Sequence, residues 1–347
     1  MTVDLRFQSS LVEVPDSLEE ANEFLLSRRM TDGLPIIPPT PERVERMLKG
    51  TRRGLREVVG RVPPLWGPAT VEKIAINAVM AGCVPEYMPA LIAAVEAVCD
   101  EPFNLHGIQT TTNSVGPMLV FNGPIRQQLN INCGAGVLGP GWRANATLGR
   151  AIRLIMLNVG GATPGDVDKS TQGWPGKYTC CIGENEEASP WEPLHVERGF
   201  RKDDSTVTVF GVDGSTQSTD ISPWPEQVIR QIAFGMVRLQ IGRGSEPLNK
   251  QEEREPIILL NPVFAGMFAE KLGHTKESLK RYLWETARFP ADWVPASHAW
   301  VIPENGRVRL MESPAGFHVI VTGGDSGYHS TAMTTVMSKS VTKRIGG

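Results

Sequence analysis

The sequence has no long uninterrupted apolar run. Nowhere do its 347 residues approach the roughly 20 consecutive apolar positions that a membrane-spanning helix needs. The first residues also lack a basic stretch followed by an apolar one, so we expect no export signal. The five cysteines are odd in number and do not resemble a disulfide framework. A reduced, cytoplasmic protein is therefore expected.

An excess of one charge is also lacking. The formal net charge is −3, with 35 basic and 38 acidic residues, and it gives no electrostatic reason to expect nucleic acid or an anionic membrane as partner. The six histidines show no His-x-x-x-His spacing and the cysteines no Cys-x-x-Cys, so we expect no structural zinc and no cofactor. A metal site assembled from distant residues stays open, with His106, Cys133, His195 and His329 as its candidates.

What the chain does contain is typical of a globular protein. Its residues are 41% apolar and 21% charged, with 35 glycines and 27 prolines, which indicates many turns and long ordered loops. We predict an α/β fold with a helix-rich main domain over residues 1–243 and a smaller C-terminal α/β unit over 256–347. The charged, apolar-poor segment 242–255 is interpreted as the linker between them.

Apolar periodicity predicts the main elements. It favours a helical hairpin over 70–83 and 86–99, and the second helix is apolar almost all round and so should be buried. Asn261 and Thr275 are expected to cap two later helices. Further predicted elements are an amphipathic helix over 16–30, a helix over 225–241, and strands at 118–121, 205–211, 256–260 and 318–322.

The stretch from Asn130 to Gly161 is the best candidate for a site. A glycine-rich loop carries Cys133, Gly134 and Gly136, and it runs into an amphipathic helix that Asn145 or Thr147 would cap. Such a loop leaves backbone N–H groups that hold anions or developing oxyanions. Arg143, just ahead of the helix, is the expected anion partner. The Gly-x-Gly-x-x-Gly match at 134–139 lacks the context of a dinucleotide fingerprint, because a Pro-Gly-Trp run follows it.

Other candidate residues lie in two further loops. Three acids stand close together at Glu184, Glu186 and Glu187; such acids are usually solvated, but one buried near Trp191 would serve as a general acid. The glycine loop 323–330 follows a predicted strand, and we expect it to face the central loop across the domain boundary. The remaining candidates are catalytic His195, Asp325 and His329, and substrate-binding Asn113 and Gly324.

Cys133 is predicted to be the reactive thiol in preference to Cys83. Cys83 ends a helix, where the negative end of the dipole disfavours a thiolate. Cys133 lies among glycine amides near Arg143 and a helix N-terminus, and each of these lowers a thiol pKa. The alternative is that Cys133 is only a small residue in a tight turn.

Two segments carry a family resemblance. Gly33-Leu-Pro-Ile-Ile-Pro-Pro-Thr40, and Asn261 to Ala287 with the later strand and glycine loop, resemble the bacterial UGSC family, which is named for a selenocysteine- or cysteine-containing motif. This chain has no Cys-Gly-Ser-Cys sequence. The redox role that the family name implies therefore carries over to none of its residues.

Three hypotheses for function follow. The first is a cofactor-independent cytoplasmic enzyme that uses a cysteine and acid–base residues on a small anionic or carbonyl-bearing substrate, as a lyase, hydratase or hydrolase. The second is a subunit of a larger redox or lyase complex, and the third is a non-catalytic small-molecule binder. A homo-oligomer is expected, because the apolar helix 86–99 and the long loop 161–203 call for more cover than one chain offers.

Overall fold

A mixed seven-stranded sheet forms the centre of the molecule. The computed structural model describes residues 7–221, 224–241, 255–293, 304–310 and 313–346. The strand order is β4-β3-β5-β10-β6-β9, and β11 pairs with β5 as well. The strands are β3 (Gly116–Asn122), β4 (Cys181–Gly183), β5 (Thr206–Thr219), β6 (Ile257–Leu260), β9 (His318–Val321), β10 (His329–Thr335) and β11 (Val341–Arg344). The α/β fold predicted from the sequence is confirmed.

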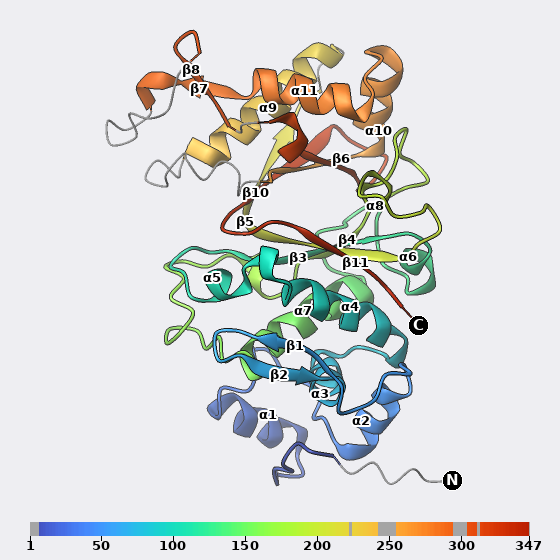
Figure 1. Cartoon of the computed structure of the whole chain (residues 1–347), viewed down its shortest axis with the longest axis vertical. Helices are drawn as coiled ribbons and strands as arrows, with labels where there is room; N and C mark the ends of the chain where they lie inside the picture. Colours follow the sequence, from blue (N-terminus) through green and yellow to red (C-terminus); the bar gives the residue numbers. More distant parts are fainter. Residues whose placement is uncertain (1–6, 222–223, 242–254, 294–303, 311–312, 347) are drawn as a thin grey trace.

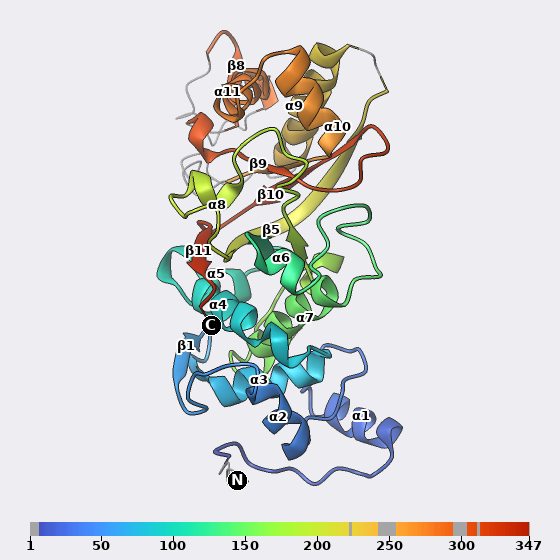
Figure 2. The ribbon, with the colours of Figure 1, turned by 90° about the vertical axis from the view of Figure 1, so that its right-hand side faces the viewer.

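Strand β5 joins two halves of this sheet. Its first half pairs with β3 and β11, and its second half pairs with β10 (Figure 2). Each half has the same order of elements, since β3 is parallel to β4 and β6 is parallel to β9, and an antiparallel strand follows each pair. The predicted boundary near residue 243 falls between these halves. The two predicted parts therefore share one sheet, and all of the predicted linker except Glu255 lies outside the described residues.

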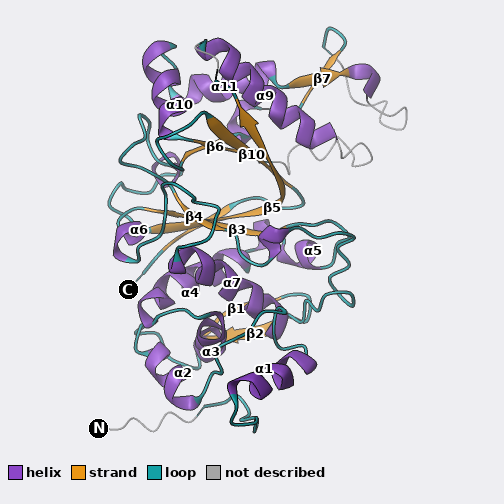
Figure 3. Ribbon diagram, turned by 180° about the vertical axis from the view of Figure 1, so that it is seen from behind, coloured by secondary structure: helices purple, strands orange, loops and turns teal. Residues whose placement is uncertain are grey.

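Helices cover the outer faces of both halves (Figures 1 and 3). The first half carries α3, α4 and α7, with the β1–β2 hairpin beyond them, and the second carries α9 and α11. The helices are α1 (Leu18–Ser27), α2 (Pro41–Leu48), α3 (Val71–Ala81), α4 (Met88–Val98), α5 (Leu105–Gln109), α6 (Ile125–Gln128), α7 (Arg143–Asn158), α8 (Leu194–Glu197), α9 (Pro225–Ile241), α10 (Pro262–Gly266) and α11 (Lys276–Thr286). Two short hairpins complete the fold: β1 (Val58–Val62) with β2 (Gly67–Thr70), and β7 (Arg288–Pro290) with β8 (Arg307–Arg309).

Side-chain alternation explains why both faces of each half are buried. In β3, Leu119 and Phe121 pack under the first set of helices, while Met118 and Val120 point to the opposite face. Strand β6 alternates in the same way between the second set of helices and that opposite face. The inner faces of the two halves meet in one apolar cluster, which includes Ile182, Phe210, Ile257, Leu259, Ile320 and Met333.

Several sequence expectations are met and two are corrected. The predicted hairpin appears as α3 and α4, and Asn261 and Thr275 cap their helices through side-chain bonds. Helix α4 is buried against its own chain, so it supplies no reason for an oligomer. Helix α7 begins at Arg143, which places the expected cap Asn145 inside the first turn.

Asn145 fixes the loop that carries Cys133. Its Oδ1 accepts from the Asn132 amide at 2.8 Å, and its Nδ2 donates to the carbonyls of Asn132 at 3.1 Å and Cys181 at 3.0 Å. The side chain is only 5% exposed. An asparagine in the first turn of α7 therefore ties the segment before the glycine loop to the start of β4.

We expect Asn145→Ala to lower the free energy of unfolding by about 2–4 kcal/mol, because it leaves buried backbone groups without partners. Urea denaturation would measure the change. The control is Gln128→Ala, an exposed amide on α6 that should shift stability by less than about 0.5 kcal/mol. Equal effects of the two variants would contradict this role for Asn145.

Candidate functional site

The carboxyl ends of β4 and β9 meet between the two halves. The Asn185 amide donates to the Val321 carbonyl at 2.7 Å, and the Thr322 hydroxyl donates to the Gly183 carbonyl at 2.8 Å. The same hydroxyl and the Gly323 amide donate to the carbonyl of Cys133, at 3.1 and 2.9 Å. The glycine loop after β9 therefore contacts the central loop, as the sequence predicted. This junction of strand ends is where ligands gather in open α/β sheets.

The turn after Asn132 presents Cys133. The Asn132 side chain accepts from the Gly134 amide at 2.8 Å and donates to the Ala135 carbonyl at 3.0 Å. Gly136 has a φ of +68° and faces open space, and Gly324 packs against Ala135 from the facing loop. In the described chain no strand directly precedes this turn and no helix directly follows it, so the Gly-x-Gly-x-x-Gly match at 134–139 lacks the strand–turn–helix setting of a dinucleotide fingerprint.

Arg126 is the cation of the site. It is 4% exposed and lies on α6, just after β3. Its guanidinium donates to both carboxylate oxygens of Glu187 at 3.0 Å and to the Glu184 carbonyl at 2.6 Å, and its Nε lies 3.0 Å from Glu186. One terminal nitrogen is 4.0 Å from the Cys133 sulfur. A single buried guanidinium thus serves two carboxylates and the thiol.

Gly123 shows why the chain turns so tightly before Arg126. Its φ is +77°, its amide donates to Glu186 at 2.7 Å, and its carbonyl accepts from Arg126 at 3.1 Å. An added Cβ would collide with the Asp204 carbonyl. Only glycine fits this conformation and this approach.

Glu184 is the most deeply buried acid of the site, with no exposed surface. One carboxylate oxygen accepts from Asn122 Nδ2 at 2.7 Å and from the Leu194 amide at 2.8 Å. The other lies 3.8 Å from Lys276, which also pairs with Glu197 at 2.8 Å. Burial raises the pKa of Glu184, and the Lys276 charge opposes this. One of the three neighbouring acids is thus buried with a raised pKa, as the sequence suggested.

Cys133 differs from the other four cysteines. Burial raises the pKa of Cys133 from its ordinary value, with Arg126 opposing the rise. Burial raises the pKa of Cys83, Cys99 and Cys180 to about 12, and it raises that of Cys181 well above its ordinary value. Cys133 is therefore the half-buried thiol with a cation beside it, but the expected lowering of its pKa is not met. Its neighbour is Arg126 and not Arg143, and Glu187 and Glu186 offset that charge.

Other predicted residues lie apart from this cluster. Arg143 donates to the Gly82 carbonyl at 2.8 and 3.0 Å and so caps the end of α3. The sequence predicted that the loop 323–330 would bring Asp325 and His329 toward Cys133. This prediction is wrong, because both side chains are exposed and the His329 ring bonds Thr219.

His195 and Asn113 also take other places. His195 is fully buried behind Glu184, and its Nε2 lies 3.4 Å from the Lys202 carbonyl. Asn113 contacts Met337, and its carbonyl accepts from Ser170, in a different loop.

The sequence reasoning missed Arg126, Lys276 and Asn122. Three acids in a loop bounded by glycine and proline require cations if they are buried, and Asn122 ends a buried strand. Nothing in the sequence indicated which of the 35 lysines and arginines would form ion pairs with these acids.

Comparisons with known proteins add no family. A scan against protein-family models finds no match, and a search of curated proteins finds no similar sequence.

In the described part of the chain, no three His, Cys, Asp or Glu side chains converge to hold a metal ion. No helix of that part is long and apolar enough to cross a bilayer.

Glu184 and Glu187 should change the stability of the fold with pH in opposite directions. Burial raises the pKa of Glu184, so its charged form opposes folding as the pH rises. Glu184→Gln should gain stability relative to wild type as the pH rises above 4.5, the ordinary pKa of this carboxyl. Arg126 lowers the pKa of Glu187, whose charged form stabilises the fold and is lost as the pH falls below its ordinary value of 4.5.

Glu187→Gln should therefore cost stability at pH 7, by under about 1 kcal/mol because this side chain is exposed, and the cost should fade toward pH 3. Thermal melts of both variants and wild type across this pH range measure both trends. Parallel profiles for the two variants would refute the assignment.

Proposed function

We propose that the chain is a cytoplasmic enzyme that acts on a small anionic or carbonyl-bearing substrate through Cys133 and its acid–base neighbours. The observation that carries the proposal is the position of the Cys133 thiol, 4.0 Å from a buried guanidinium that also pairs with Glu187, a carboxylate whose side chain is 55% exposed. An exposed carboxylate on a buried cation is replaceable by a substrate carboxylate, which makes the same bidentate contact.

Such a substrate would place its reactive carbon beside the thiol. The sulfur then adds to a carbonyl carbon, the thiol proton passes through the released Glu187 carboxylate to the carbonyl oxygen, and a sulfur–carbon adduct forms. The step needs no further reactant. Lyase, hydratase and hydrolase chemistry all begin from such an adduct or from the same proton transfers, and the reaction class stays open among them.

Two other proposals remain beside this one. The first is a subunit of a larger redox or lyase complex whose chemistry lies partly on a partner; the resemblance to the UGSC family gives this role no residue, because no Cys-Gly-Ser-Cys sequence is present. The buried Arg126 would equally serve a small-molecule binder that performs no chemistry. Neither of these two proposals requires the Cys133 thiol to add to a substrate carbonyl carbon.

Alkylation tests the thiol directly. Iodoacetamide labelling, read by peptide mass spectrometry, should modify Cys133 faster than the other four cysteines. The rate should climb as the pH rises above neutrality, because the pKa of Cys133 lies above its ordinary value. Glu187→Gln should shift this profile to lower pH, since it removes a negative charge that raises the thiol pKa. Faster labelling of Cys83, or an unshifted profile, would refute the assignment.

Pyruvate, which carries both a carboxylate and a ketone, is a suitable probe of the substrate class. Millimolar pyruvate should slow the labelling of Cys133, whereas acetone should not. Equal protection by acetone would remove Arg126 as the anion anchor. Cys133→Ser that still binds pyruvate as wild type by calorimetry would favour the non-catalytic binder.

We also propose a homo-oligomer, now on a different surface. Leu65 and Trp66 are neighbouring exposed apolar side chains in the β1–β2 turn, and such side chains mark contact surfaces when they gather. Light scattering at micromolar concentration should give a multiple of 37.9 kDa. A mass equal to one chain would end this proposal.

A further inference from the structure

A cleft of about 760 Å³ lies away from Cys133. The end of α1 with the turn that follows it, the C-terminal half of α7, and the segment 163–178 form its walls. None of the residues that surround Cys133 lines it. Its volume is in the range of small-molecule sites.

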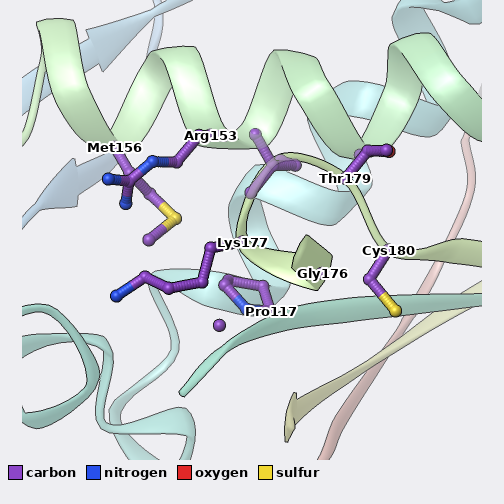
Figure 4. Close-up of a pocket in the computed structure, with 10 residues that line it drawn as sticks. Pro117, Arg153, Met156, Gly176, Lys177, Thr179 and Cys180 are labelled. Carbon is purple, nitrogen blue, oxygen red and sulfur yellow. The ribbon is translucent and has the colours of Figure 1, made fainter. Parts of the chain in front are cut away.

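Cations outnumber anions in this cleft. Asp168 is 6% exposed and accepts from Lys177 at 2.8 Å and from Arg153 at 3.4 Å. Lys177 also donates to the Ser170 hydroxyl at 2.9 Å. In Figure 4 the charged ends of Arg153 and Lys177 extend to the same side, away from Cys180. One carboxylate therefore answers two cations.

Two further charges stand at the rim. Both carboxylate oxygens of Asp32 accept from the Arg150 guanidinium at 2.8 Å, which neutralises the charge of Asp32. Arg29, with a left-handed φ of +55°, is exposed, and its guanidinium makes no bond to any residue that the structure describes. The cleft therefore keeps a positive excess after its internal pairs are formed.

The rest of the wall is mostly apolar or aromatic. Its apolar and aromatic side chains are Leu26, Leu157, Pro164, Trp174, Pro175 and Tyr178, and Thr31, Thr163, Ser170 and Gln172 add polar groups. The indole N–H of Trp174 is buried and finds no acceptor within the described ranges. Aromatic faces beside paired cations suit a flat ligand that carries an acid group.

We propose that this cleft binds a small organic anion with an aromatic ring, whose acid group contacts Lys177 and Arg153 and whose ring lies against Trp174 and Tyr178. The site is separate from Cys133 and does not depend on the enzyme proposal. Arg29 adds charge at the entrance.

The test uses 1-naphthoate and its uncharged analogue 1-naphthalenemethanol on the full chain, with calorimetry and tryptophan fluorescence as readouts. Naphthoate should bind about ten-fold more tightly than the alcohol, the difference expected of one charge-assisted contact. Lys177→Met should remove that difference, and Arg29→Ala should reduce it. Trp174→Leu should weaken both compounds.

Two controls keep the outcome clear. Arg281→Ala, on an exposed arginine of α11, and Cys133→Ser should both bind naphthoate as wild type. If Lys177→Met fails to give a native circular dichroism spectrum, Arg29→Ala decides, because that side chain is exposed and unbonded among the described residues. Equal binding of acid and alcohol, no binding of either, or wild-type affinity in Arg29→Ala would overturn the proposal.

Discussion

Strand β5 is the constraint on which the arrangement depends. Its fourteen residues pair with β3 and β11 in one half and with β10 in the other. The backbone hydrogen bonds of the sheet are therefore completed only when both halves are folded. The inner faces of both halves then share one apolar cluster. This packing brings the carboxyl ends of β4 and β9 together. The loops that follow them, Glu184–Glu187 and Thr322–Gly324, therefore lie side by side.

Charge balance decides what these loops do. A buried carboxylate without a partner is strongly disfavoured, and Glu184 and Glu186 are both nearly sealed from solvent. Arg126 and Lys276 answer them from opposite sides, one from the helix after β3 and the other from the start of α11. The site is therefore completed by one residue from each half of the chain.

The sequence predicted the elements better than their partners. Apolar periodicity located α3, α4, α7 and β6, because each buries a continuous face. It missed β10 and β11 and the second half of β5, which are rich in serine and threonine and resemble loops in composition. These strands are held by pairing across the sheet, and such pairing leaves no local signal.

The candidate site divides in the same way. Cys133, Glu184 and Gly324 were found from loops and strand ends, which are local features. Arg126 and Lys276 were not, since their meaning depends on which acids the fold places next to them. Arg143 was chosen for its closeness in sequence to Cys133, but the geometry of α7 directs it to the end of α3. Nearness along the chain proved a poor guide to electrostatic pairing.

Helix α7 relates the two candidate sites. Asn145, in its first turn, fixes the loop of Cys133, and Arg153, eight residues later, lines the cleft, which places them about 12 Å apart along one helix. Their electrostatics differ. At Cys133 the carboxylates of Glu186 and Glu187 offset the charge of Arg126, and burial keeps the pKa of the thiol above its ordinary value. In the cleft, Arg153 and Lys177 share the single carboxylate of Asp168, so a net positive charge remains. An anion entering the cleft meets an attractive field directly, whereas one approaching Cys133 must first displace Glu187, so the second place selects for ligands that match a bidentate carboxylate.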